Sequence, residues 1–287
     1  MKEINNRILV LGASGMLGHV VYDVLRKSKR YDVKGTKNSL TGFNYLVDFN
    51  VKNLDSLDAL FHTYKPAVVI NCIGVLINDA NRNIENAVFI NSYFPHYVAN
   101  LATTFGAKLI HVSTDCVFSG KSGKYSETDF SDAIDIYGRS KSLGEVNYGS
   151  HLTLRTSIIG PELKNTGSGL LNWFLNSGNS IYGYTDHFWG GVTTLQLAKV
   201  ILQVLENDYT GLVHVSNGLE ISKYELLNIF KEVWCKENLS IEPCEVGFNN
   251  KSLLSSDKYQ FVVPGYREMI KDLYAWMKEY PSLYRHY

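Results

Sequence analysis

Residues 8–18 read ILVLGASGMLG and predict the architecture of the whole chain. The run 8–11 is entirely apolar, as expected for a strand that is buried on both faces. Three glycines follow with the spacing G-x-x-G-x-x-G and lead into a helical pattern. Gly12 permits a tight turn, Gly15 lets a diphosphate approach the helix N-terminus, and Gly18 allows close packing of helix on strand. We therefore expect a dinucleotide-binding loop, with a ligand-free glycine-rich turn as the alternative.

The same alternation of strand and helix continues to about residue 159. Strands are expected at 8–11, 33–36, 67–70, 109–112 and 152–156, and helices at 15–27, 54–64, 84–105 and 137–148. Pro95 is the weak point of the third of these helices. Alternation of this kind indicates a parallel sheet with helices on both faces, and right-handed crossovers then give an α/β, Rossmann-type doubly wound sheet.

The pattern changes after residue 159. Segments 160–169 and 178–191 are rich in Gly, Asn, Ser and Tyr and predict loops around a short helix. A helix from 194 to about 206 and a strand at 212–215 resume the earlier pattern, and helices are expected at 224–234 and 269–277. We predict a dinucleotide-binding domain over 1–158, rejoined by about 193–215, and a smaller substrate-binding lobe formed mostly from 159–287.

Composition narrows the classes of function. The 287 residues contain 28 Lys+Arg and 28 Asp+Glu, and this zero net charge argues against a nucleic-acid partner. No apolar run approaches the roughly 18–20 residues that span a bilayer, so no membrane partner is expected. The four cysteines are far apart and the histidines are not grouped, which predicts no metal site and free thiols in a reducing cytoplasm.

The end of the second expected strand bears on the choice of cofactor. Residues 35–38 read GTKN and contain no carboxylate, the group that would hold the ribose of NAD. Thr36 does not repel a 2′-phosphate and Lys37 can attract one, so NADPH is preferred over NADH; a solvated lysine is the alternative. Asp48 and Phe49 lie further along, where they either hold the adenine edge or cap the next helix.

A second group of candidates follows the strand at 67–70. Asn71, Cys72, Ile73 and Gly74 come directly after it. Ligands of open α/β sheets bind beyond the carboxyl ends of the strands. These small or slim residues are therefore expected to line the cofactor site, with an ordinary turn as the alternative.

The candidate chemistry lies at the end of the strand at 109–112 and in the helix after it. Tyr137 and Lys141 are four residues apart, which places them on one helix face. A lysine ammonium beside a phenol is expected to lower the phenol pKa, and such a tyrosine can protonate a developing alkoxide. Thr114 can hold the same oxygen with its hydroxyl. The similar pair Tyr274 and Lys278 follows no strand-end hydroxyl and is expected to be surface packing.

These motifs together resemble the extended short-chain dehydrogenase/reductase superfamily and, more narrowly, the dTDP-4-dehydrorhamnose reductase family and its relatives. The resemblance covers nearly the whole chain. It is carried by GASGMLG at 12–18, STDCVFSG at 113–120, YGRSKSLGE at 137–145, LRTS at 154–157 and GVTT at 191–194.

The resemblance implies a role for each matching position. The catalytic set would be Thr114, Tyr137 and Lys141. The nicotinamide cofactor, NADPH or NADH, would contact Gly12, Gly15, Met16, Leu17, Gly18, Thr36, Lys37, Asp48, Phe49, Cys72, Ile73, Gly74, Tyr137 and Lys141. A nucleotide-sugar substrate would contact Thr114, Asp115, Val117 and Phe118.

The implied reaction is hydride delivery to the 4-keto carbon of a nucleotide-linked 6-deoxyhexose, for surface polysaccharide. Tyr137 would protonate the new hydroxyl, and a homodimer is compatible with the resemblance.

Two positions depart from the family pattern. The residue after R-T-S is often aromatic in the reductases, whereas here Ile158 follows Ser157. Trp189 would supply a replacement stacking surface or, alternatively, pack in the core. The position after the second strand, often acidic in relatives, is Thr36 or Lys37. An epimerase or dehydratase on the same scaffold and a non-catalytic nucleotide-binding subunit are the alternative functions, because fold alone does not separate them.

Overall fold

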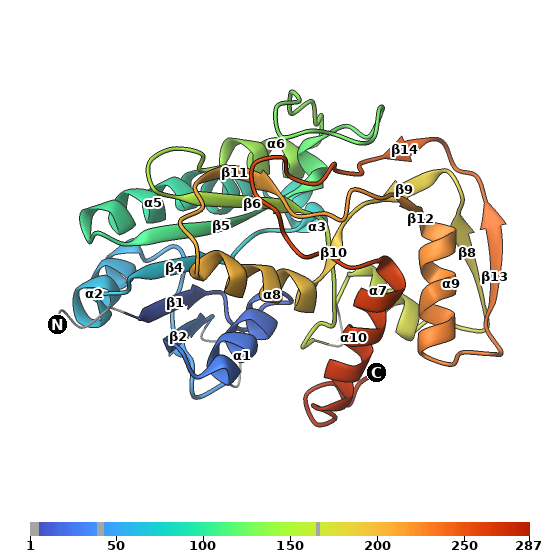
Figure 1. Cartoon of the computed structure of the whole chain (residues 1–287), viewed down its shortest axis with the longest axis horizontal. Coiled ribbons are helices and arrows are strands. Elements are labelled where there is room, and N and C mark those ends of the chain that lie inside the picture. Colours follow the sequence, from blue (N-terminus) through green and yellow to red (C-terminus); the bar gives the residue numbers. More distant parts are fainter. Residues whose placement is uncertain (1–5, 39–42, 165–166) are drawn as a thin grey trace.

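A seven-stranded parallel sheet forms the centre of the computed structural model, which describes residues 6–38, 43–164 and 167–287 (Figure 1). Its spatial order is β11-β6-β5-β4-β1-β2-β3, and every neighbouring pair is parallel. The strands are β1 (Arg7–Leu11), β2 (Asp32–Lys37), β3 (Val47–Asp48), β4 (Val68–Asn71), β5 (Lys108–Thr114), β6 (Leu152–Thr156) and β11 (Gly211–His214). The predicted α/β doubly wound sheet is confirmed.

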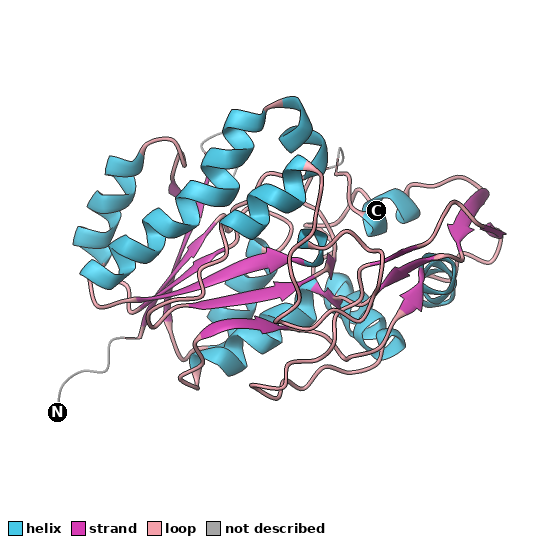
Figure 2. Cartoon of the chain, turned by 90° about the horizontal axis from the view of Figure 1, so that it is seen from above, coloured by secondary structure: helices cyan, strands magenta, loops and turns pink. Residues whose placement is uncertain are grey.

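Helices cover both faces of this sheet (Figure 2). Along β1, Ile8 and Val10 pack into one core, and Leu9 and Leu11 pack into the other, because successive side chains of a strand point to opposite faces. The first core contains side chains of α1 (Gly18–Ser28) and α8 (Thr194–Leu205), and the second those of α2 (Leu54–Tyr64) and α5 (Phe94–Thr104). This arrangement explains the uninterrupted apolar run at residues 8–11.

The helix expected at 84–105 is divided into three parts. It consists of α4 (Ile84–Ala87), the π-helix η1 (Val88–Tyr93) and α5, with Pro95 in the first turn of α5. Proline has no N–H to donate to the preceding turn, so regular α-helical bonding is interrupted where the π-helix ends. Such π segments frequently lie at functional sites. The preceding helix, α3 (Ile77–Arg82), is short.

Two short helices follow β5. They are the 3₁₀ helix η2 (Asp115–Val117) and α6 (Ile136–Leu143). The helix expected at 137–148 therefore ends earlier, at Leu143. Gly144 ends it, and a Cβ at that position would collide with the backbone carbonyl of Asn91 in η1. Close packing against η1 thus requires a glycine here.

The lobe beside the sheet contains short strands as well as helices. Its strand pairs are β7 (Ile158–Ile159) with β10 (Val192–Thr193) and β8 (Ser180–Tyr184) with β13 (Ser240–Cys244), and its three-stranded sheet is β12 (Ile221–Ser222), β9 (His187–Trp189) and β14 (Asn249–Asn250). Its helices are α7 (Leu170–Leu175), α9 (Lys223–Val233) and α10 (Tyr266–Lys278). The segment 178–191, expected to be a loop, therefore holds β8 and β9; residues 165–166 of the other expected loop lie outside the described residues.

The chain leaves the main sheet after β6 and returns to it with β11, which pairs with β6 at the sheet edge. The division into domains at residue 158 stays a prediction.

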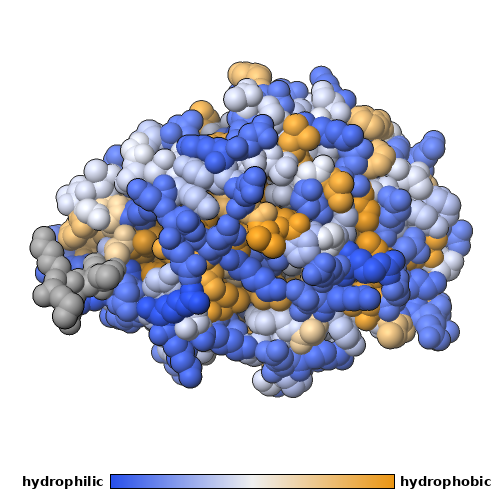
Figure 3. Space-filling model, viewed as in Figure 1, coloured by the Kyte–Doolittle hydropathy of each residue, from blue (hydrophilic) through white to orange (hydrophobic). Residues whose placement is uncertain are grey.

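Figure 3 shows one face of the molecule, on which hydrophilic residues predominate and apolar residues lie in scattered groups. Among the described helices, none is both long and apolar enough to cross a membrane. Within the same described ranges, no three His, Cys, Asp or Glu side chains are grouped so that they could hold a metal ion.

Candidate active site

The glycine loop connects β1 to α1 and is fixed by the end of β2. Gly12 has a φ of +80°, in the left-handed region that favours glycine. Its N–H donates to Thr36 Oγ1 at 3.1 Å, and the N–H of Ala13 donates to the Thr36 carbonyl at 2.7 Å. A Cβ at Gly18 would collide with the Gly12 carbonyl, so the helix approaches the strand as the motif predicts.

The same loop leaves hydrogen-bond donors available for an anion. In the part of the chain that the structure describes, the backbone N–H groups of Ser14, Met16 and Leu17 have no acceptor. Gly15 is exposed, and a Cβ there would meet only the Gly12 carbonyl, at 3.3 Å. Free N–H groups at a helix N-terminus suit a phosphate. The loop therefore fits the diphosphate of a dinucleotide.

The adenosine end of the predicted cofactor site differs from expectation. The Thr36 hydroxyl accepts the loop N–H described above, and Thr36 is buried. Lys37 is neither solvated nor in a loop: it lies in β2 with 7% of its surface exposed, and its ammonium pairs with Asp48 at 3.1 Å across β3. Phe49 is buried against Phe94, so its ring is a core residue and not an adenine contact. The cap of α2 is a different residue, Asn53.

The turn after β4 lies where the sequence places it. The N–H of Cys72 donates to the carbonyl of Leu11 at 3.0 Å, and the N–H of Ile73 donates to Asn71 Oδ1 at 3.1 Å. Gly74 is exposed. These bonds fix Cys72, Ile73 and Gly74 beside the glycine loop, at the carboxyl edge of the sheet.

Helix α6 carries the candidate acid and its lysine. Asp135 caps the helix by accepting the N–H of Gly138 at 2.9 Å. A Cβ at Gly138 would collide with the carbonyl of Cys116, so the start of α6 is pressed against η2. This contact brings Tyr137 to the end of β5, where Thr114 lies. Lys141 Nζ donates to the Val112 carbonyl of β5 at 2.8 Å.

The charge states of this set differ from the prediction. Burial raises the pKa of Tyr137, Cys116 and Asp115 raise it further, and only the Thr114 hydroxyl acts in the other direction. The expected net lowering of the Tyr137 pKa is therefore wrong, because burial of the phenol outweighs any stabilisation of the phenolate by the Lys141 ammonium. A phenol with a raised pKa keeps its proton at neutral pH, which is the form that a proton donor needs.

Burial also acts on the lysine. It lowers the pKa of Lys141 to about 8, whereas Glu145 and Cys72 favour the charged form. In the role proposed for Tyr137, the ammonium form of Lys141 stabilises the negative charge that develops on the phenol oxygen as the proton leaves. We expect kcat/KM to fall as the pH rises through about 8, where Lys141 becomes neutral.

The measurement is a pH–rate profile of kcat/KM, which reports on groups of the free enzyme. Glu145→Gln should move the alkaline limb to lower pH, because it removes a charge that raises this pKa. A profile that stays flat between pH 7 and about 9.5 would contradict this assignment.

A buried ion pair supports the end of β5, and the sequence analysis assigned it no role. Glu145 accepts from the Ser113 hydroxyl at 2.7 Å and pairs with Arg155 through two bonds of 2.8 and 2.6 Å. Arg155 also contacts His214 Nε2 at 3.1 Å. The pair joins the segment after α6 to β5, β6 and β11. Both residues were visible in the motifs at 137–145 and 154–157, but nothing in their spacing shows that they meet.

Asn91 in η1 is a second residue that the sequence analysis missed. Its Oδ1 accepts the N–H of Val75 at 2.8 Å, and its Nδ2 donates to the Val75 carbonyl at 3.0 Å and to Ser140 Oγ at 3.1 Å. One buried amide therefore joins the cofactor-side turn to α6. An asparagine within a helical pattern gives no sequence signal for this role.

The predicted substrate residues divide into two groups. Thr114 and Asp115 lie at the carboxyl edge near Tyr137, and the Thr114 hydroxyl donates to Asp115 Oδ1 at 3.1 Å. Val117 and Phe118 are fully buried, and Phe118 stacks on Tyr125 with ring centroids 4.1 Å apart. Their assignment as substrate contacts is therefore wrong: they form a core under the loop.

Trp189 is likewise a core residue. Only 3% of its surface is exposed, and its ring packs against Tyr266. The core alternative stated for this tryptophan is the one that the structure shows, so it offers no stacking surface.

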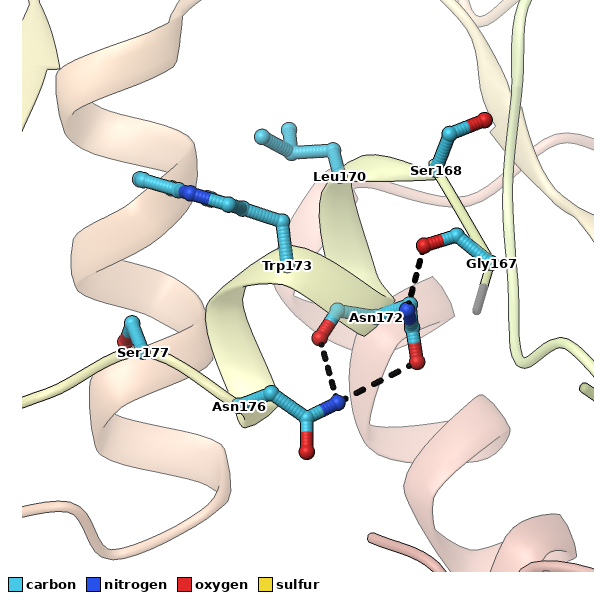
Figure 4. Close-up of a pocket in the computed structure, with 7 residues that line it drawn as sticks. All are labelled: Gly167, Ser168, Leu170, Asn172, Trp173, Asn176 and Ser177. Atoms are coloured by element: carbon cyan, nitrogen blue, oxygen red, sulfur yellow. Dashed lines mark hydrogen bonds between the residues drawn. The ribbon is translucent and has the colours of Figure 1, made fainter. Parts of the chain in front are cut away.

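A pocket of about 500 Å³ lies along α7 (Figure 4). The close-up shows Trp173 pointing away from a group of bonded amides, in which Asn172 donates to the Gly167 carbonyl and Asn176 donates to Asn172. None of the predicted catalytic or cofactor residues lines it.

Comparisons with known proteins agree with the motifs. The chain is 28% identical to a dTDP-4-dehydrorhamnose reductase of Aggregatibacter actinomycetemcomitans over 211 residues, which cover 71% of this chain and 69% of the relative. It is 32% identical to methionine adenosyltransferase 2 subunit beta of Danio rerio over 145 residues, or 48% of this chain and 42% of that protein.

Among solved structures, dTDP-4-dehydrorhamnose reductase of Bacillus anthracis in complex with NADP superposes with a TM-score of 0.81 at 21% identity, covering 94% of this chain and 99% of the other. The resemblance stated from the motifs is confirmed. A family model described as RmlD substrate binding domain matches residues 6–253, and the chain belongs to that family.

Proposed function

We propose that this protein reduces the 4-keto group of a nucleotide-linked 6-deoxyhexose, using NADPH or NADH. The observation that carries the proposal is the position of Thr114, Tyr137 and Lys141 at the carboxyl edge of the sheet, next to a glycine loop with free N–H groups. The relative from Aggregatibacter actinomycetemcomitans is named for a substrate of this class, dTDP-4-dehydrorhamnose, which supports the proposal.

Each group of the proposed site has a separate role in the reduction. A bound nicotinamide cofactor supplies the hydride. The hydroxyl groups of Thr114 and Tyr137 hold the carbonyl oxygen of the sugar, and Tyr137 transfers its proton to that oxygen as negative charge develops on it. The ammonium of Lys141, which donates to the Val112 carbonyl, stabilises the negative charge left on the phenol oxygen. The product is the nucleotide-linked 6-deoxyhexose with a hydroxyl group at C4.

The test is a screen of dTDP-, GDP-, UDP- and CDP-linked 4-keto-6-deoxy sugars, followed by NADPH absorbance. Stoichiometric loss of NADPH with one of them supports the proposal. Failure with all four, in a protein that still binds NADPH, would contradict it and favour a binding subunit. The match to the adenosyltransferase subunit is the observation that favours this second candidate. The free cysteines of the chain fit a cytoplasmic protein.

The glycine loop gives a prediction on cofactor binding. In Gly15→Val the chain should fold, because a side chain at this exposed position meets only one carbonyl atom at 3.3 Å. The valine would occupy the place of the phosphates, so NADPH affinity should fall more than 100-fold, the loss of about two charge-assisted hydrogen bonds.

Fluorescence titration with NADPH checks this, with Gly178→Val as the control, since an added Cβ at the exposed Gly178 meets nothing within 4 Å. Unchanged affinity of Gly15→Val would remove the loop from the cofactor site. In the wild-type titration, NADPH should bind at least as well as NADH, because the carboxylate nearest the end of β2, Asp48, is neutralised by Lys37.

A further inference from the structure

Two lysines of the lobe extend from one small sheet. In β12-β9-β14, Ser222, Phe188 and Asn250 lie in one row. Lys223 follows Ser222 and Lys251 follows Asn250, so each is one step from that row. Lys223 is the first residue of α9, and Lys251 directly follows the end of β14, so both lie at the margin of this small sheet. The ammonium of Lys223 lies 6.0 Å from the ring of Trp189, the neighbour of Phe188 on β9.

This margin of the small sheet meets the residues after β5. Lys251 contacts the loop that follows η2, where its Cγ would lie 3.1 Å from a Cβ at Gly120. Lys251 also lies close enough to Cys116 to lower the pKa of that thiol, and Cys116 and Asp115 both favour the charged form of Lys223. Asp115 and Cys116 also raise the pKa of Tyr137, so Lys223 shares both of these neighbours with the phenol, and Lys251 shares Cys116.

Neither ammonium has its charge satisfied within the protein. Across the described ranges, Lys223 and Lys251 make no ion-pair contact with a carboxylate and donate no hydrogen bond. Both are partly buried, and burial lowers the pKa of Lys223. Lys236, another partly buried lysine of the lobe, instead donates to the carbonyls of Phe174 and Leu175. A partly buried lysine ammonium that no carboxylate or carbonyl holds by a direct bond is available to an anionic ligand.

Resting on the proposed function, we propose that Lys223 and Lys251 form an anion site that receives the diphosphate of the nucleotide-linked substrate while its sugar faces Tyr137. The diphosphate is attached at the anomeric carbon, across the sugar ring from C4, so it enters from the lobe side when C4 is at the phenol. The site is separate from the glycine loop, which binds the diphosphate of the cofactor.

The experiment measures binding without turnover. Isothermal titration of the full chain with dTDP, UDP and inorganic pyrophosphate should show that Lys223→Met and Lys251→Met each weaken binding about 10- to 100-fold, as expected for a charge-assisted hydrogen bond. Lys223→Arg should retain most of the affinity. NADPH affinity should not change in any of these variants. Lys223→Met leaves the helix cap intact, since the capping box is formed by Ser222 and Glu225.

Lys271→Met is the matched control, because Lys271 is exposed on α10 and should have no effect on any of the probes. Unchanged affinity for dTDP, UDP and pyrophosphate in the double variant would overturn the proposal, as would a wild-type protein that binds none of the three. The reductase proposal fails separately, in the substrate screen. If the double variant Lys223→Met, Lys251→Met turns over with an unchanged KM for the nucleotide-sugar, the reductase proposal stands. The two lysines would then not belong to its substrate site.

Discussion

Tyr137→Phe is expected to reduce kcat by a factor of about 10²–10⁴, the usual contribution of a general acid. The substitution removes one hydroxyl and keeps the ring that packs near Val75 and Ile90, so the fold and the position of α6 should not change. Cofactor affinity should stay within about threefold of wild type, because the glycine loop, where we propose that the diphosphate binds, is unchanged. Initial rates of NADPH oxidation and a binding titration of the same preparation give the two quantities.

The matched control is Tyr274→Phe. Tyr274 and Lys278 reproduce the i, i+4 spacing on α10, where Lys278 Nζ lies 5.1 Å from the Tyr274 ring centroid. That pair is in the lobe, far along the chain from β5, and its loss should leave kcat unchanged. Equal effects of the two substitutions, or full turnover by Tyr137→Phe, would remove Tyr137 from the mechanism.

Arg155→Met is expected to have the largest effect on stability. It would leave the Glu145 carboxylate buried without a cation, since the exposed fractions of the two side chains are 4% for Arg155 and 8% for Glu145. Breaking a buried pair from one side costs about 3–5 kcal/mol of unfolding free energy. Urea denaturation followed by circular dichroism measures this loss.

Two further variants separate the charge effect from a packing effect. Lys199→Met breaks the exposed pair of Lys199 with Asp272, whose side chains are 47% and 44% exposed, and should cost at most about 1 kcal/mol. Adding Glu145→Gln to Arg155→Met removes the stranded charge and keeps an acceptor for Ser113, so it should recover much of the loss. A double variant as unstable as Arg155→Met would show that packing, not charge, holds this region.

The sequence predicts well whatever depends on local pattern. The run at 8–11 and the glycine spacing after it define a strand, a turn and a helix within one short segment, and the structure has all three. The parallel, doubly wound sheet follows from alternation along the chain together with the handedness of crossovers. Thr114, Tyr137 and Lys141 lie together, as expected, for the same reason: strand ends of a parallel sheet meet at one edge, so position along the chain indicates position in space. Their catalytic role stays a prediction.

The errors arise where the answer depends on burial or on a distant partner. Val117 and Phe118 belong to the same motif as Thr114, but a motif does not say which side chains turn into the core. The sign of the pKa shift at Tyr137 was wrong because desolvation, which a sequence does not show, outweighs a neighbouring cation. The alternative of a solvated loop lysine at position 37 is wrong because Lys37 is buried in β2 and its partner, Asp48, lies on another strand.

A fragment of the gene that ends at residue 158 would lack β11 and leave β6 as the outermost strand. Every residue of β6 is buried in the intact chain, so the truncated sheet would expose this strand and its unpaired backbone N–H and C=O groups, which promotes aggregation. A shortened protein that contains only the main sheet and its helices must therefore keep α8 and β11. A short linker would replace the lobe segment between β6 and α8, and the chain would end after β11.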